Sequence, residues 1–221
     1  VSGAAGGATS AGANTSLERC SETLGTLAVD DGRGKEWYAS FGAATKITTI
    51  EPLIRLAVQQ SNCFVITSIG NNRTESKISS ITDKQRNSGE FRAGSKQQKG
   101  QRVAADYYME PSIIIDNSST GRMAGALGGL IGRGGAAVAA GMESKVSVVT
   151  LTMFDIRSGV QIAISEGNAT ATNFGAALGA FGGGAAGGLG GFSQTPEGKA
   201  TVAAFVDAYN KMVISLRNYK A

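Results

Sequence analysis

Side chains that commonly perform catalysis or bind metals are scarce in this chain. Histidine is absent, which excludes Ser-His-Asp and Cys-His catalysis and removes the commonest ligand of zinc. Acidic residues remain, but no two of them have a spacing that requires acid–base chemistry, and we interpret them as caps at strand ends. They are Asp30, Asp31, Asp106, Glu110 and Asp116. We therefore predict that the protein is not an enzyme and that it uses no metal and no cofactor.

The two cysteines form a candidate disulfide. Cys20 precedes the apolar run at residues 24–29, and Cys63 opens the run at residues 64–66. If these runs are parallel strands joined by a helical crossover, both cysteines lie at the same end of neighbouring strands, within reach of a disulfide. A disulfide would indicate an oxidising compartment. The alternative, two unpaired buried thiols, stays open at this point.

Hydrophobic periodicity predicts an α/β (α+β) fold with a mixed β-sheet. A strand at 24–30, a helix at 45–60 and a strand at 64–68 make a βαβ unit with a right-handed crossover. Pro52 falls in the first turn of that helix. The aromatic residues Trp37, Tyr38 and Phe41 are predicted to pack against the sheet edge.

The rest of the chain predicts an antiparallel part of the sheet and a closing helix. Pro111 indicates an edge or a bulge in its strand. A tight turn at 157–159 makes the last two strands a long antiparallel hairpin, and apolar residues three and four apart make the closing helix amphipathic. The expected elements are a polar surface helix at 72–86, a helical turn at 103–105, strands at 107–116, 144–156 and 160–172, and a helix at 197–218.

Two Gly/Ala tracts, at 121–141 and 175–191, contain more than half of the 32 glycines. Because they carry almost no charge, they do not resemble solvated linkers. Three interpretations stay open: β-hairpins within a ring, helices that approach closely through small residues four apart, and surface loops. The candidate residues for oligomer contact or membrane insertion are Gly125, Gly128, Gly129, Gly132, Arg133, Gly134, Gly135, Gly179, Gly182, Gly183, Gly184, Gly187 and Gly188.

Charge and hydropathy narrow the range of partners. The net charge is +4 over 221 residues, and the basic residues at 84–102 are too dispersed, with too few aromatic neighbours, for a nucleic-acid site. No uncharged apolar run reaches the ~20 residues of a spanning helix. Residues 1–19 form a Gly/Ala/Ser-rich arm, which we expect to lie against an adjacent subunit.

The order of these segments resembles the CsgG family, the curli-secretion outer-membrane lipoprotein channels and their relatives. The similarity extends over residues 24–218 through TLAVDD, LIRLAVQQSNCFVI, ADYYMEPSIIIDNSS and VSVVTLTMFDIRSGVQIAISEGNATAT. It implies a ring at the outer membrane, with two insertions that can form transmembrane hairpins. The tracts depart from a barrel wall, because they lack alternation of apolar and polar residues and aromatic girdles. Cys20 is interior, so it does not match the lipid-anchoring cysteine of the family.

These observations predict a homo-oligomer on the periplasmic side of the bacterial outer membrane. A CsgG-like domain at 20–221 would carry insertions at 118–143 and 170–196. The ring would line a secretion pore, with a secreted protein or other envelope components as partners and no nucleic acid. Arg133 would be a pore-facing group or a solvated hairpin tip. The alternative is a periplasmic scaffold ring that binds peptidoglycan or an envelope machine without a channel.

Overall fold

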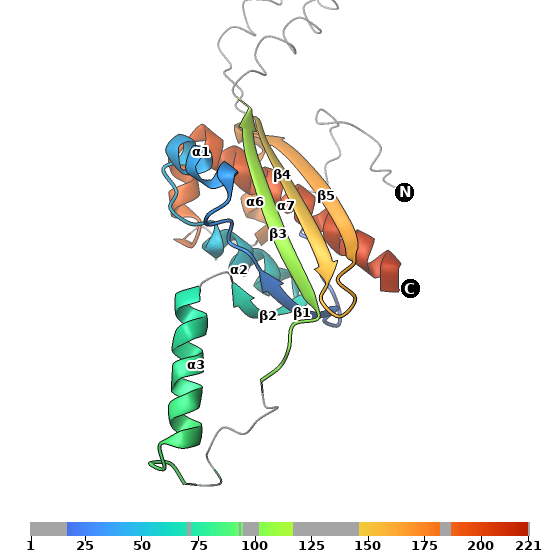
Figure 1. Ribbon diagram of the computed structural model, residues 1–221. Helices are drawn as coiled ribbons and strands as arrows, with labels where there is room; N and C mark the ends of the chain where they lie inside the picture. The colour runs from blue at the N-terminus through green and yellow to red at the C-terminus, as the bar shows by residue number, and fades with distance from the viewer. Residues whose placement is uncertain are drawn as a thin grey trace, which may run out of the picture.

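The computed structural model contains one five-stranded mixed sheet in the order β2-β1-β3-β4-β5 (Figure 1). It describes residues 17–69, 72–92, 94, 102–116, 146–181 and 187–220. β1 pairs in parallel with both β2 and β3, whereas β3, β4 and β5 are antiparallel. The strands are β1 (Gly25–Val29), β2 (Phe64–Ile69), β3 (Tyr107–Asp116), β4 (Val146–Asp155) and β5 (Gln161–Thr170).

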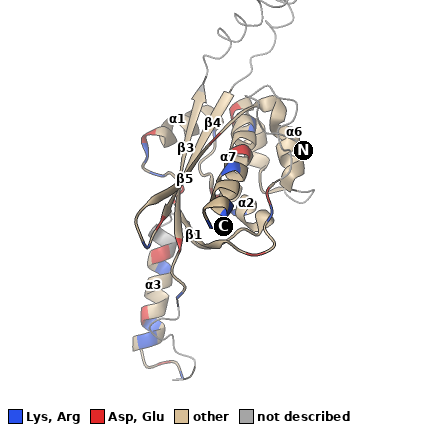
Figure 2. Ribbon diagram, turned by 90° about the vertical axis from the view of Figure 1, so that its right-hand side faces the viewer, with Lys and Arg blue, Asp and Glu red and all other residues tan. Residues whose placement is uncertain are grey.

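Helices α2, α6 and α7 cover one face of this sheet, and α3 projects from the body (Figures 1 and 2). The α-helices are α1 (Glu36–Thr45), α2 (Glu51–Ser61), α3 (Asn72–Asn87), α6 (Phe174–Phe181) and α7 (Pro196–Lys220), with 3-10 helices η2 (Ala171–Asn173) and η4 (Gly190–Gln194). The predicted α/β class with a βαβ unit, a mixed sheet, a long hairpin and a closing helix is confirmed.

The structure differs from the sequence prediction mainly in α1. Trp37, Tyr38 and Phe41 lie on this helix, which ends where Lys46 adopts a left-handed conformation with φ of 61°. Only Phe41 and Thr45 are buried on it, so its apolar pattern is too sparse to reveal a helix by periodicity. Residues 103–105 also form no helical turn.

Pro111 lies in β3, the central strand of the sheet, but at a position where β3 has no partner on its β1 side. The Asp30 backbone N–H donates to the carbonyl of Met109, so that side of β3 faces β1. Pro111, two residues further along, points its ring nitrogen to the same side. Pairing with β1 extends only from Tyr107 to Met109, so no ladder hydrogen bond is lost at the proline.

The core lies between the sheet and α7. On β4 the side chains of Ser147, Val149, Leu151 and Met153 alternate inward and are fully buried. Gly167 lets α7 lie close against β5, because a Cβ at this position would overlap the carbonyl oxygen of Ala204 on α7. The helix therefore lies directly on the last two strands, as its long closing apolar stripe predicts.

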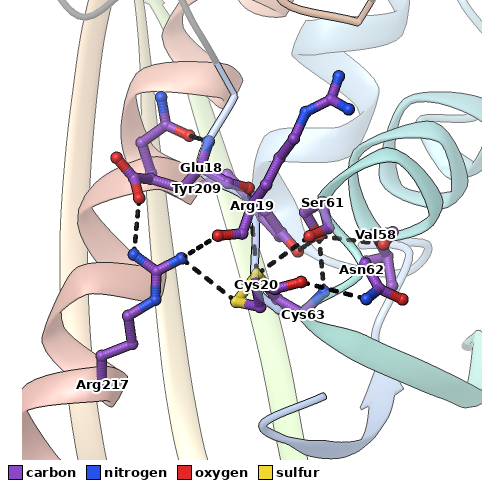
Figure 3. The surroundings of a disulfide bond; sticks show 10 residues. Glu18, Arg19, Cys20, Val58, Ser61, Asn62, Cys63, Tyr209 and Arg217 are labelled. Carbon is purple, nitrogen blue, oxygen red and sulfur yellow. Dashed lines mark hydrogen bonds and ion pairs between the residues drawn. A yellow bond between two sulfur atoms is a disulfide. The ribbon is translucent and has the colours of Figure 1, made fainter. Parts of the chain in front are cut away.

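Cys20 and Cys63 form a disulfide in the structure, with their Cα atoms 5.0 Å apart (Figure 3). The pairing lies where β1 and β2 begin, because the Leu24 N–H donates to the Cys63 carbonyl at 2.7 Å. Arg217 of α7 holds the same segment through an ion pair with Glu18 at 2.7 Å. Leu17 is buried as well. Residues 17–19, assigned to the arm by sequence, thus contact the folded domain.

We predict that the disulfide contributes substantially to stability. It closes a loop with a sequence separation of 43, for which the chain-entropy relation gives about 4 kcal/mol. Urea unfolding of the oxidised protein and of the double variant Cys20→Ser/Cys63→Ser should differ by about that free energy. Alkylation of unfolded protein without reductant should add no mass, and two added groups per chain would contradict the pairing.

Candidate assembly site at the glycine-tract end of the sheet

Three neighbouring strands end in register at one end of the sheet. Asp116, the last residue of β3, pairs with Val146, the first of β4, and Val146 pairs with Thr170, the last of β5. Both glycine-rich insertions therefore connect to the same end of the molecule, which is the upper end in Figure 1. The predicted hairpin at 144–172 already implies that the end of its second strand lies beside the start of its first, and the structure adds the register and the pairing with β3.

Most of the predicted glycine site lies outside the described residues. This applies to the insertion at 118–143, with its glycines and Arg133, and to Gly182, Gly183 and Gly184 in the second tract. Gly179, Gly187 and Gly188 lie in the part of the chain that the structure describes, and all three are exposed. The structure thus supplies geometry for one of the two tracts.

The described part of the second insertion is helical and does not form a β-hairpin. Thr170 and Asn173 make a capping box after β5, and the chain continues through η2 into α6. Ala177, Ala180 and Phe181 of α6 are buried in the core. Burial of these residues outweighs the low helix propensity of glycine, roughly 1 kcal/mol per residue relative to alanine. Residues 174–181 are therefore helical, and the close approach of helices through small residues stays a prediction.

Gly175 and Gly179 line the exposed side of α6. An added Cβ at either position would meet no atom within 4 Å. By contrast, a Cβ added at Gly198 would lie 2.5 Å from the carbonyl oxygen of Phe192. Gly198 and Gly167 are thus required by the fold of one chain, whereas Gly175 and Gly179 are not. Their small size leaves room for close approach by another chain.

A network of charged and aromatic groups follows β1. The Asp30 carboxylate accepts hydrogen bonds from the Gly32 N–H at 2.7 Å and the Tyr108 hydroxyl at 3.0 Å. Burial, together with this bond to Asp30, raises the pKa of Tyr108 well above its usual range. Lys35 pairs with Glu110. These bonds fix the loop before α1.

Gly32 in this loop has φ of +79° and lies under the indole of Trp37, so a side chain there would collide with the ring. Asp31 is fully buried, and its carboxylate accepts the Arg33 N–H at 3.1 Å and pairs with the Arg33 side chain at 3.0 Å. The acidic residues of the loop therefore bond to groups of their own chain, as strand-end caps do.

A cavity of about 420 Å³ lies at the opposite end of the sheet. Its charged side chains make internal bonds: Asp106 accepts the Thr26 N–H, and Asp155 accepts the Ser158 N–H, both at 2.9 Å. The bonds from the Thr26 backbone and hydroxyl hold the pKa of Asp106 below its ordinary value. The lining residues are Leu24, Ala104, Ala105, Asp106, Tyr107, Asp155, Ile156, Arg157 and Lys220.

The described residues include no group of three or more His, Cys, Asp or Glu side chains arranged to hold a metal ion. No helix among them combines the length and apolar character that a membrane crossing requires.

The chain matches no known protein-family model, and it matches no curated protein. The resemblance to the CsgG family therefore rests on the order of the sequence segments. What the structure itself defines is an α/β protein with a mixed sheet, in which the strands that flank the two insertions have their ends in register.

We predict opposite effects of alanine at two glycines. Gly167→Ala should destabilise the fold by about 1–3 kcal/mol, because the new methyl group has no space beneath α7. Gly179→Ala should raise the unfolding free energy by up to about 1 kcal/mol through helix propensity. In assembled protein, Gly179→Ala should nevertheless weaken association about tenfold, equivalent to 1.4 kcal/mol, because the methyl group prevents close approach of another chain.

Urea unfolding and analytical ultracentrifugation measure the two effects separately. Gly159, at the exposed β4–β5 turn with φ of +71°, gives a comparison in which alanine causes backbone strain without a clash. Unchanged association of Gly179→Ala would contradict a role for the α6 glycines in contacts between chains.

Proposed function

We propose that this chain is a non-enzymatic, ring-forming protein associated with the outer membrane, similar to the CsgG channels, whose ring lines a secretion pore. The main support for the proposal is the register of Asp116, Val146 and Thr170, which brings both glycine-rich insertions to one end of the sheet. In a ring of identical copies, this end would present two low-charge insertions from every subunit to the membrane. The disulfide is consistent with an oxidising periplasm.

Such a protein would act through the shape and charge of its central opening, and it would make or break no covalent bonds. α7 packs on β4 and β5, and the insertions follow strand ends that lie in one continuous ladder. Copies that meet at this end would pack glycine against glycine, which permits backbone approach closer than larger side chains allow. The width and lining of the central opening would then decide which secreted protein passes.

A periplasmic scaffold ring without a channel is the second candidate. It is favoured by α6, because this part of the second insertion packs on the core of its own chain through Ala177, Ala180 and Phe181. While α6 is packed on the core of its own chain, residues 174–181 cannot form strands of a barrel. The ring would then bind peptidoglycan or another envelope component.

The oligomeric state of the full chain tests the shared part of both proposals. Native mass spectrometry in detergent and in detergent-free buffer should give a single species with a mass several times the 22.5 kDa of one chain. A monomer under both conditions would contradict ring formation.

Conductance in planar lipid bilayers separates the two candidates. A pore-forming ring should give discrete, reproducible current steps, because each inserted ring opens one aqueous path. A preparation of reduced and alkylated protein, which lacks the disulfide and is destabilised, controls for current steps that do not require the folded protein. Assembled protein that binds vesicles or peptidoglycan but gives no steps would favour the scaffold.

A further inference from the structure

One face of the sheet is left uncovered by α2, α6 and α7, although the loop before α1 bonds there to the outward side chains of Tyr108 and Glu110. α2, α6 and α7 lie on the other face (Figure 2), and on this face Ile114 of β3 is 60% exposed and Ile164 of β5 is 61% exposed. Val65 on β2 is 53% exposed. Isolated exposed apolar residues are ordinary, but Val65, Ile114 and Ile164 share one face of the sheet, which favours an interaction surface there.

The open face has small hydroxyl side chains at its centre and carries two carboxylates, of which Glu166 accepts a hydrogen bond from Asn168 at 3.1 Å. Ser112, Thr150 and Thr152 form its middle, where Ser112 pairs with Thr150 and all three point away from the core. Larger side chains flank them, among them Ile114 and Ile164. Among the described outward side chains of the strands, two are carboxylates, Glu110 and Glu166, and none is basic. Glu110 pairs with Lys35 from the neighbouring loop.

Helix α3 carries a surface of the opposite charge. At 100° per residue, Lys77, Ile78, Ile81 and Lys84 fall on one side of the helix, and all four are exposed. Ile78 is 43% and Ile81 55% exposed. The acidic residues Glu75 and Asp83 lie toward the other side, where Glu75 pairs with Arg102 at 3.1 Å. Lys84 reaches Glu90 at 3.6 Å, with both side chains largely exposed.

A helix of this length that projects from the body gains little stability from its own hydrogen bonds. Most residues of α3 are polar, yet its two isoleucines lie together with basic residues, which is the pattern of a helix that docks on an acidic and apolar surface. The open sheet face is such a surface, and it lies on a different part of the same chain.

We propose that α3 of one copy lies across the open sheet face of the next copy, with Ile78 and Ile81 over the Thr150–Thr152 centre and Lys77 near Glu166. This inference rests on the proposed homo-oligomer and identifies its interface. The two contact surfaces differ, so the contact is head-to-tail, and head-to-tail contacts close into rings when the rotation between neighbours permits. The glycine-tract ends of all copies then remain free to meet at one end of the ring.

Two defective variants test the inference when they are mixed. Lys77→Glu/Ile81→Glu removes the α3 surface, and Ile164→Lys/Glu166→Lys removes the open-face surface. Each variant alone should be monomeric by light scattering after gel filtration. Their 1:1 mixture should form heterodimers, because the first retains an intact sheet face and the second an intact α3. Formation of heterodimers also shows that both variants fold.

A charge exchange tests the pairing of individual residues. Lys77→Glu and Glu166→Lys should each weaken association at least tenfold, and the chain with both substitutions should recover most of it. Ile214→Glu is the matched control, because Ile214 is 42% exposed on α7, on the other side of the molecule, and should assemble like the unmodified chain.

The outcomes distinguish this inference from the proposed function. If the unmodified chain is monomeric in detergent and in buffer, the proposed function fails. If it assembles and both surface variants assemble equally well, the proposed function stands and the α3 interface is overturned. Monomeric variants that show native circular dichroism but form no heterodimer when mixed would also overturn the head-to-tail contact.

Discussion

Burial of α7 against β4 and β5 organises the whole molecule. The contact requires Gly167, because any side chain there would enter the backbone of the helix at Ala204. It places the long closing helix on one face of the sheet and leaves the other face open. β3, β4 and β5 form one antiparallel ladder, so the ends of these strands are in register where the glycine-rich insertions begin.

Much of the fold could be predicted because its strands alternate cleanly. In β4, every second residue from Ser147 to Met153 is buried, and the closing helix has an equally regular stripe. Helix α1 escapes prediction, since its burial involves little more than Phe41 and Thr45. The helix at residues 174–181 is equally hard to predict. Its glycines have a low helix propensity, and the burial of Phe181 that stabilises it depends on contacts with residues distant in sequence.

The candidate site was predictable in composition but only partly in arrangement. Glycine content identifies Gly179 as unusual, but only the structure separates it from Gly167 and Gly198, which one chain needs for its own packing. The shared end of the two insertions is implied by the predicted antiparallel hairpin, whereas its pairing with β3 comes from the structure. The open sheet face depends on which side α7 occupies, and an alternating strand does not reveal which layer covers it. Helical spacing places Ile78 and Ile81 on one side of α3, but only the structure shows that this side is exposed.

A single chain thus has two surfaces suited to other copies: small residues at the insertion end, and a basic helix with an acidic sheet face elsewhere. Together, these surfaces would join identical chains into a closed assembly. Particle imaging of the full chain in detergent is the sharpest test of that assembly. We expect closed rings of uniform subunit number, whereas monomers, or open filaments of variable length, would contradict it.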